Sequence, residues 1–190
     1  MAYLNEQQLQ ALGFKELGSN VKISEKASLY DCSQIKIGDN SRIDDFCILS
    51  GKIEIGSYCH ITPMCLIAGG QPGIYIDDFS TLAYGVKVFA QSDDYSGETM
   101  VNSLIPKVYK KEYLASVVIK KHVIIGAGAT IFPGVVLENG CSIGSMSLVL
   151  KSTIEWGIYA GIPAKRIKER KKDLLVLANK FLSEEKNDSI

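Results

Sequence analysis

The sequence predicts an all-β protein built as a parallel β-helix, a solenoid of short strands and tight turns. Aliphatic residues recur every six positions along most of the chain, and the fourth residue after each is nearly always small or β-branched. Gly, Asp and Asn gather at the turns between them. Three six-residue units close a triangular coil of about eighteen residues, in which residues one coil apart stack. The recurring aliphatic positions are Ile23, Leu29, Ile37, Ile43, Leu49, Ile55, Ile61, Ile67, Ile76, Leu82, Val88, Ile119, Ile125, Ile131, Leu137, Ile143 and Val149.

Four of the five cysteines occupy the small positions of this repeat. They are Cys47, Cys59, Cys65 and Cys141, and no Cys-x-x-Cys pair is present. Free cysteine most often serves as small buried apolar filler. We therefore expect packing residues here, and neither a disulfide framework, a zinc site nor a nucleophile.

Composition limits the classes of partner. The chain has 190 residues, of which 46% are hydrophobic, and 21 Lys and Arg balance 21 Asp and Glu. This length fits one domain, and a neutral charge gives no basic surface for nucleic acid. Because no apolar run approaches a membrane span and no signal peptide is present, we predict a cytoplasmic protein.

The regular coils are interrupted or flanked by other segments. Asn5 and Gln8 form the pattern of a capping box, so a short helix over residues 5–12 is expected to end at Gly13 and to cover one end of the solenoid. Apolar spacing from Ile167 onward predicts a C-terminal helix. The predicted segments of this single domain are an N-terminal cap (1–20), coils (21–91), an extruded loop (92–117), coils (118–155), and a final segment with the C-terminal helix (156–190).

Two further segments carry a family resemblance. Residues 124–135 read IIGAGATIFPGV, and residues 160–165 read AGIPAK. Together with the hexads, they make the chain resemble bacterial hexapeptide-repeat acetyltransferases, which include galactoside, maltose and O-antigen or capsule sugar O-acetyltransferases. The resemblance runs from Ile23 to Lys168. It implies a left-handed coil, acetyl-CoA as donor without a metal, and a homotrimer with its active site between two subunits.

Acyl transfer from a thioester needs a general base, an oxyanion donor and a slot for the CoA arm. Imidazole is the natural base at neutral pH, and the chain has two histidines. His60 lies between the inward residues Cys59 and Ile61, so it should point out of the coil and is our predicted base. His122 occupies a turn position and is predicted to be a surface residue.

The extruded loop departs from the family pattern. Galactoside and maltose acetyltransferases carry a catalytic histidine there, whereas this chain has Ser92, Asp93, Asp94 and Tyr95. Either the base is His60, oriented by a loop carboxylate, or the carboxylate itself takes the proton. We favour a dyad of His60 with Asp93 or Asp94, because a carboxylate on the imidazole N–H fixes the tautomer and raises the basicity.

The resemblance also implies positions for the donor. Ala127 and Ser145 match positions whose backbone meets the pantetheine arm of CoA. Lys151, Lys165 and Lys168 match basic positions near the nucleotide, where phosphates favour point charges.

These observations predict an acetyl-CoA-dependent O-acetyltransferase acting on a saccharide or sugar precursor. The alternative is N-acetylation of a nucleotide-linked amino sugar, which fits the residues almost as well. A non-catalytic β-helix scaffold explains neither the long loop nor the AGIPAK ending. A zinc enzyme of the γ-carbonic anhydrase type needs three histidine ligands, and this chain has two.

Overall fold

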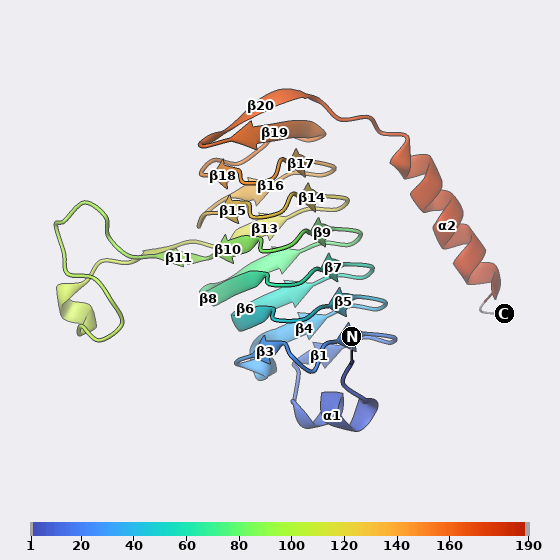
Figure 1. Cartoon of the computed structure of the whole chain (residues 1–190), viewed down its shortest axis with the longest axis horizontal. Helices are drawn as coiled ribbons and strands as arrows, with labels where there is room; N and C mark the ends of the chain where they lie inside the picture. The colour runs from blue at the N-terminus through green and yellow to red at the C-terminus, as the bar shows by residue number, and fades with distance from the viewer. Residues whose placement is uncertain (1, 189–190) are drawn as a thin grey trace.

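The chain folds into a parallel β-solenoid, as predicted (Figure 1). The structure is a computed structural model that describes residues 2–188. Each coil contributes one short strand to each of three flat faces. The first, here called face A, has the strand order β2-β5-β7-β9-β14-β17-β19. Its strands are β2 (Lys22–Ile23), β5 (Arg42–Ile43), β7 (His60–Ile61), β9 (Thr81–Leu82), β14 (Ile124–Ile125), β17 (Ser142–Ile143) and β19 (Gly157–Gly161).

The other two faces are joined by two long strands, β6 (Ile48–Ile55) and β8 (Leu66–Ile76), which run through the corner between them. Face B consists of β3 (Ser28–Leu29), the first residues of β6 and β8, β10 (Lys87–Phe89), β15 (Thr130–Ile131) and β18 (Leu148–Val149). Face C consists of β1 (Glu16–Leu17), β4 (Ile35–Ile37), the last residues of β6 and β8, β13 (Val117–Ile119) and β16 (Val136–Leu137). A single 3-10 turn, Cys32–Gln34, precedes β4.

The six-residue period positions the core. Ile37 lies in register with Ile55, and Ile43 with Ile61, as the coil length predicts. Every cysteine is buried and unpaired. Burial raises the pKa of the Cys59 thiol to about 11, so this side chain is an apolar filler and not a nucleophile.

One helix and one hairpin cover the two ends of the solenoid. Helix α1 (Glu6–Ala11) has the predicted capping box, and its Leu9 joins the core under the first coil. At the other end, β20 (Ala164–Glu169) pairs antiparallel with β19 and covers the last coil. The expected helix near Ile167 is therefore wrong: the basic run is a strand, because the open sheet edge takes it as a partner. Helix α2 begins only at Leu174 and runs to Asp188.

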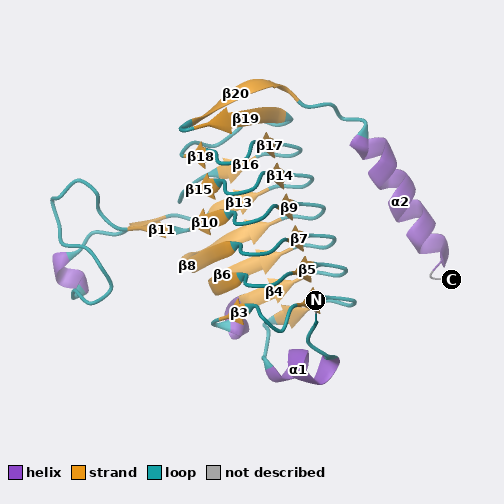
Figure 2. Ribbon diagram, in the orientation of Figure 1, coloured by secondary structure: helices purple, strands orange, loops and turns teal. Residues whose placement is uncertain are grey.

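The extruded loop leaves the corner between faces B and C as a short ribbon of β11 (Gln91–Ser92) and β12 (Tyr113–Leu114). Beyond this ribbon lie residues 93–112, here called the arm, which project away from the coils (Figures 1 and 2). The arm contains one 3-10 turn, Lys107–Tyr109. Between residues 2 and 188, no helix is both long and apolar enough to cross a membrane.

Candidate functional site

His60 lies on β7 with its side chain outside face A, as predicted, and is 38% exposed. Its Nε2 is 2.8 Å from Oδ2 of Asp44, whose side chain is only 3% exposed. The other oxygen of Asp44 accepts a 2.6 Å hydrogen bond from Nε of Arg42. Arg42 thus balances the buried carboxylate, which in turn orients the imidazole.

Within this chain the carboxylate beside His60 is Asp44. Asp93 and Asp94 of the predicted dyad belong to the arm, which leaves the solenoid at the corner between faces B and C, away from face A. Coil length could have found this partner. Arg42 is one coil before His60, and Asp44 follows two residues later on the same outer surface.

Asp94 holds the arm together. Its Oδ1 accepts hydrogen bonds from the amide and hydroxyl of Ser96 at 2.8 and 2.7 Å. Its Oδ2 accepts two from Thr99, both at 2.9 Å. These bonds, those from Ser96 first, lower the pKa of the Asp94 carboxyl well below its usual range. A carboxylate so well satisfied is a weak proton acceptor.

Asp93 is placed differently. It is exposed, and it lines a cleft of about 220 Å³ at the root of the arm, together with Phe132 and Pro133. In the part of the chain that the structure describes, its carboxylate accepts no hydrogen bond. Of the two predicted aspartates of the arm, Asp93 is the one free to meet a substrate.

The predicted CoA residues lie mainly at the corner between faces A and B, here called the A–B corner. Ala127 and Ser145 stand on successive coils of this corner, joined by a 2.8 Å bond from the amide of Met146 to the carbonyl of Ala127. Lys165 is the second residue of β20 and pairs with Ala160 on the last coil, next to the same corner. The structure thus brings these three residues into one line along the solenoid.

The other two lysines lie farther away. Lys168 pairs with Ile158, two residues before Ala160 on β19 and farther from the A–B corner. Lys151 follows β18, at the corner between faces B and C. Both are exposed at the C-terminal end of the solenoid, and neither is on the line of Ala127 and Ser145.

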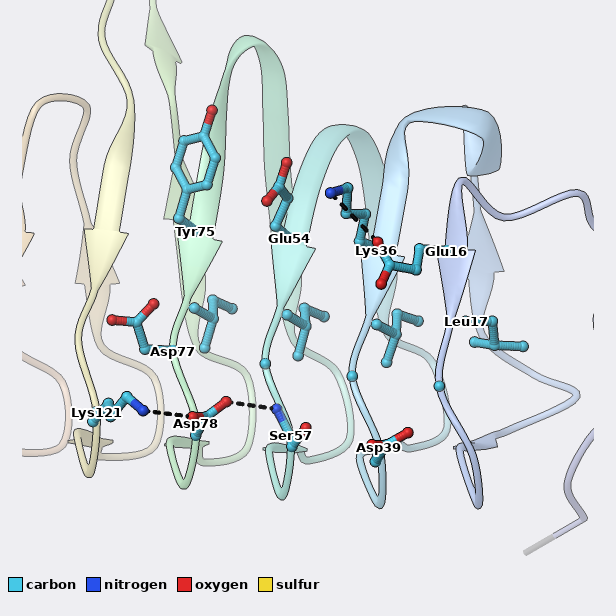
Figure 3. A pocket seen from close by; sticks show the side chains of 16 residues that line it. Glu16, Leu17, Lys36, Asp39, Glu54, Ser57, Tyr75, Asp77, Asp78 and Lys121 are labelled. Atoms are coloured by element: carbon cyan, nitrogen blue, oxygen red, sulfur yellow. Dashed lines mark hydrogen bonds and ion pairs between the residues drawn. The ribbon is translucent and has the colours of Figure 1, made fainter.

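A hollow of about 620 Å³ forms an open groove along face C (Figure 3). Five carboxylates line it, and its two lysines are both paired: Lys36 lies 3.4 Å from Glu16, and Lys121 lies 2.8 Å from Asp78. Such a surface repels phosphates. None of the predicted site residues lines it, so it is a poor candidate for CoA or a nucleotide. The carboxylates are Glu16, Asp39, Glu54, Asp77 and Asp78.

Within residues 2–188, no group of three or more His, Cys, Asp or Glu side chains is arranged to hold a metal ion.

Comparison with known proteins decides the family. A family model described as bacterial transferase hexapeptide (six repeats) matches residues 34–69. The dTDP-4-amino-4,6-dideoxy-D-glucose acyltransferase of Escherichia coli is 44% identical over 184 residues, which cover 95% of both chains. The chain belongs to the bacterial hexapeptide-repeat transferases. Like this relative, the protein is an acyltransferase of that family.

A solved structure agrees over nearly the whole chain. AntD, an N-acyltransferase from Bacillus cereus, was solved in complex with dTDP and 3-hydroxybutyryl-CoA. It is 44% identical, with a TM-score of 0.95, over 97% of this chain and 98% of that one.

A relative described as an O-acetyltransferase is more distant. WbbJ of Escherichia coli, described as a lipopolysaccharide-biosynthesis O-acetyl transferase, is 27% identical over 70% of this chain and 67% of its own. The comparisons therefore favour the alternative, N-acylation of a nucleotide-linked amino sugar, over our main expectation of O-acetylation.

Proposed function

We propose that this protein transfers an acetyl group from acetyl-CoA to the amino group of a dTDP-linked 4-amino-4,6-dideoxy sugar. The observation that carries the proposal is the 44% identity, over 95% of both chains, to an acyltransferase of that sugar. The arm and the AGIPAK ending, which a plain scaffold does not need, lie within the matched length.

An amine acceptor changes what the base must do. An α-amino group has a pKa of about 7.7–8.0, far below that of a hydroxyl, and is the stronger nucleophile once its proton is lost. A carboxylate suffices to bind the ammonium form and to take up its proton. This favours an arm carboxylate over the imidazole that O-acetylation calls for.

Asp93 is the carboxylate best placed for this role, because Asp94 is committed to Ser96 and Thr99. Asp93 stands at the root of the arm, beside Phe132 and Pro133 of its own coils, and we propose that in the assembly it acts at the A–B corner of a neighbouring subunit. His60, held by Asp44 on the outer surface of face A, binds the acceptor there.

The A–B corner provides the donor site. Ala127 and Ser145 present small side chains, which leave the backbone open to the amides of the pantetheine arm. Lys165, with Lys168 and Lys151 farther out, provides positive charge for the phosphates at the C-terminal end. The oxyanion of the tetrahedral intermediate needs a donor in the same place, and backbone N–H groups of the corner are the available type.

The proposed assembly is a homotrimer. Face B and the A–B corner expose large apolar side chains on successive coils, a pattern typical of a surface that another chain covers. These residues are Phe46, Ile48, Met64, Met146 and Leu150, each at least 40% exposed. Sedimentation equilibrium should give three times the chain mass. Both proposed substrates are charged and do not cross membranes unaided, so we place the reaction in the cytoplasm.

Mass spectrometry of the product tests the function. The protein is incubated with acetyl-CoA and either dTDP-4-amino-4,6-dideoxyglucose or the matching 4-hydroxy sugar. We expect acetylation of the amine alone. Acetylation of the hydroxy sugar at a comparable rate would restore the O-acetyltransferase reading, and no product with either sugar would reject both.

Three variants locate the base. Asp93→Asn should lower kcat by at least about 100-fold, the low end for general-base catalysis. His60→Ala should raise KM about 10-fold and change kcat little, as expected for a binding group. Glu54→Gln, a half-buried carboxylate of the face C groove, is the matched control and should behave as wild type. If His60→Ala loses the 100-fold and Asp93→Asn does not, the imidazole is the base.

A further inference from the structure

Tyr84 stands on the line of the proposed donor site, one coil before Ala127. Leu82 pairs with Ile125, so the residues two positions later, Tyr84 and Ala127, are also in register. A 2.8 Å hydrogen bond from the amide of Gly128 to the carbonyl of Tyr84 links the two turns. Tyr84, Ala127 and Ser145 are therefore three successive steps of one ladder along the A–B corner.

The three steps differ in bulk. Ala127 and Ser145 are small, whereas Tyr84 is aromatic and 63% exposed. Its hydroxyl makes no hydrogen bond to any residue that the structure describes. Neither packing nor hydrogen bonding within the chain therefore accounts for a tyrosine at this step. A molecule lying over the two small residues meets this large side chain next.

The length of the CoA arm places its acyl end here. About thirteen bonds separate the phosphate of CoA from its sulfur, which span roughly 15 Å when extended. From β20, where Lys165 lies, to the turn of Ala127 there are three strand spacings, about 14 Å. The sulfur of an arm that starts at Lys165 thus reaches the Ala127 step, and the acyl group extends toward Tyr84.

We propose that Tyr84 closes the acyl end of the CoA track and makes the enzyme selective for acetyl over longer acyl groups. This inference rests on the proposed function and names its acyl specificity. Tyr84 acts through the volume of its ring at the end of the track, so it is a specificity-determining residue and takes no part in proton transfer.

The test compares acetyl-CoA with 3-hydroxybutyryl-CoA as donors to the same dTDP-linked amino sugar. Tyr84→Ala should raise the ratio of kcat/KM for 3-hydroxybutyryl-CoA to that for acetyl-CoA at least 10-fold. Tyr84→Phe should keep the wild-type ratio, because the ring and not the hydroxyl fills the space. Tyr30→Ala removes an equally exposed tyrosine from the first coil, away from this ladder, and should also keep the ratio.

Titration calorimetry with the two thioesters gives a second readout without turnover, and circular dichroism checks the fold of each variant. Tyr84→Ala should bind 3-hydroxybutyryl-CoA at least 10-fold more tightly than wild type does. An unchanged donor ratio in an active, folded Tyr84→Ala protein overturns the inference and leaves the proposed function standing. A wild-type protein that transfers neither acyl group overturns the proposed function, and the inference falls with it.

Discussion

The coils bury their apolar side chains, whereas the arm leaves its apolar side chains exposed. Leu82, on the fourth coil, is fully buried, whereas Leu104, at the far end of the arm, is 89% exposed. The coils stack identical aliphatic positions and gain stability from each new layer. The arm is held by local hydrogen bonds instead, chiefly those to Asp94 and a 3.0 Å bond from the amide of Met100 to the carbonyl of Tyr109.

This difference separates the coils, which form the folded core, from the arm, whose surface is available to a neighbouring subunit. No arm side chain enters the core, so removal of the arm leaves every layer of the solenoid intact. The arm in turn exposes apolar side chains that its own chain does not cover, including Val108 at 81%. We infer that the coils carry the stability and that the arm completes the site of a neighbouring subunit.

Removing the arm gives the largest expected effect. Residues 93–112 are replaced by Asn-Gly, which joins Ser92 to Tyr113 through a two-residue hairpin turn. Acyl transfer should fall at least about 1,000-fold, because both the proposed base and a wall of the site are lost. The melting temperature, followed by circular dichroism, should stay close to that of wild type.

Assemblies that mix the arm-less chain with other variants test whether the arm acts on a neighbouring subunit. The arm-less chain, co-assembled with excess Asp93→Asn chains, should stay inactive, since no subunit then supplies the carboxylate. At acceptor concentrations well below KM, where His60→Ala chains alone are about 10-fold less active than wild type, co-assembly with them should raise the activity above that of either chain alone. An arm-less protein that is inactive because it fails to fold would show that the arm belongs to the folding unit.

A matched pair of leucines sharpens the comparison. Leu82→Ala should lower the free energy of unfolding by about 2–5 kcal/mol, since it opens a cavity between stacked layers. Leu104→Ala should change it by less than about 0.5 kcal/mol, as surface substitutions usually do. Urea denaturation measures both. Equal losses in the two variants would mean that the arm is packed as tightly as the coils.

The same contrast explains what the sequence could predict. Period six determines the inward positions and the register of each layer, as the pairing of Ile37 with Ile55 shows. Coil length also places Asp44 on the outer surface one coil before His60, but the period alone does not indicate that the two side chains form a hydrogen bond. Tyr84 joined no candidate set either, since its significance depends on its step relative to Ala127.

The arm and the end of the chain marked the limit of sequence-based prediction. Residues 92–116 break the repeat, so their position as an insertion was predictable, but no period indicates what they touch. The basic run from Lys165 has helical composition and forms β20 because an unpaired strand edge lies beside it. Tertiary context outweighed local propensity there.

The smallest expected effect is a pH dependence of stability that originates in the coils. The arm has no histidine, whereas His122 occupies a coil turn, with its ring stacked on Phe79 at a centroid distance of 5.1 Å. Burial, followed by the charges of Lys121 and Arg170, lowers the pKa of His122 in the folded protein. The unfolded chain then binds the proton more readily, so the stability contributed by neutral His122 is lost as the pH falls below about 6.5.

His122→Asn removes this titration and keeps a residue that tolerates the left-handed turn, where φ is +59°. Between pH 7.5 and 5.5 the melting temperature of wild type should fall more than that of the variant. The difference between the two falls should be a few degrees at most, since 1 kcal/mol moves the melting temperature of a domain this size by about 2–4 °C. The stacking lost with the imidazole lowers both variant values alike and cancels in the comparison. Parallel curves for the two proteins would place the acid sensitivity elsewhere.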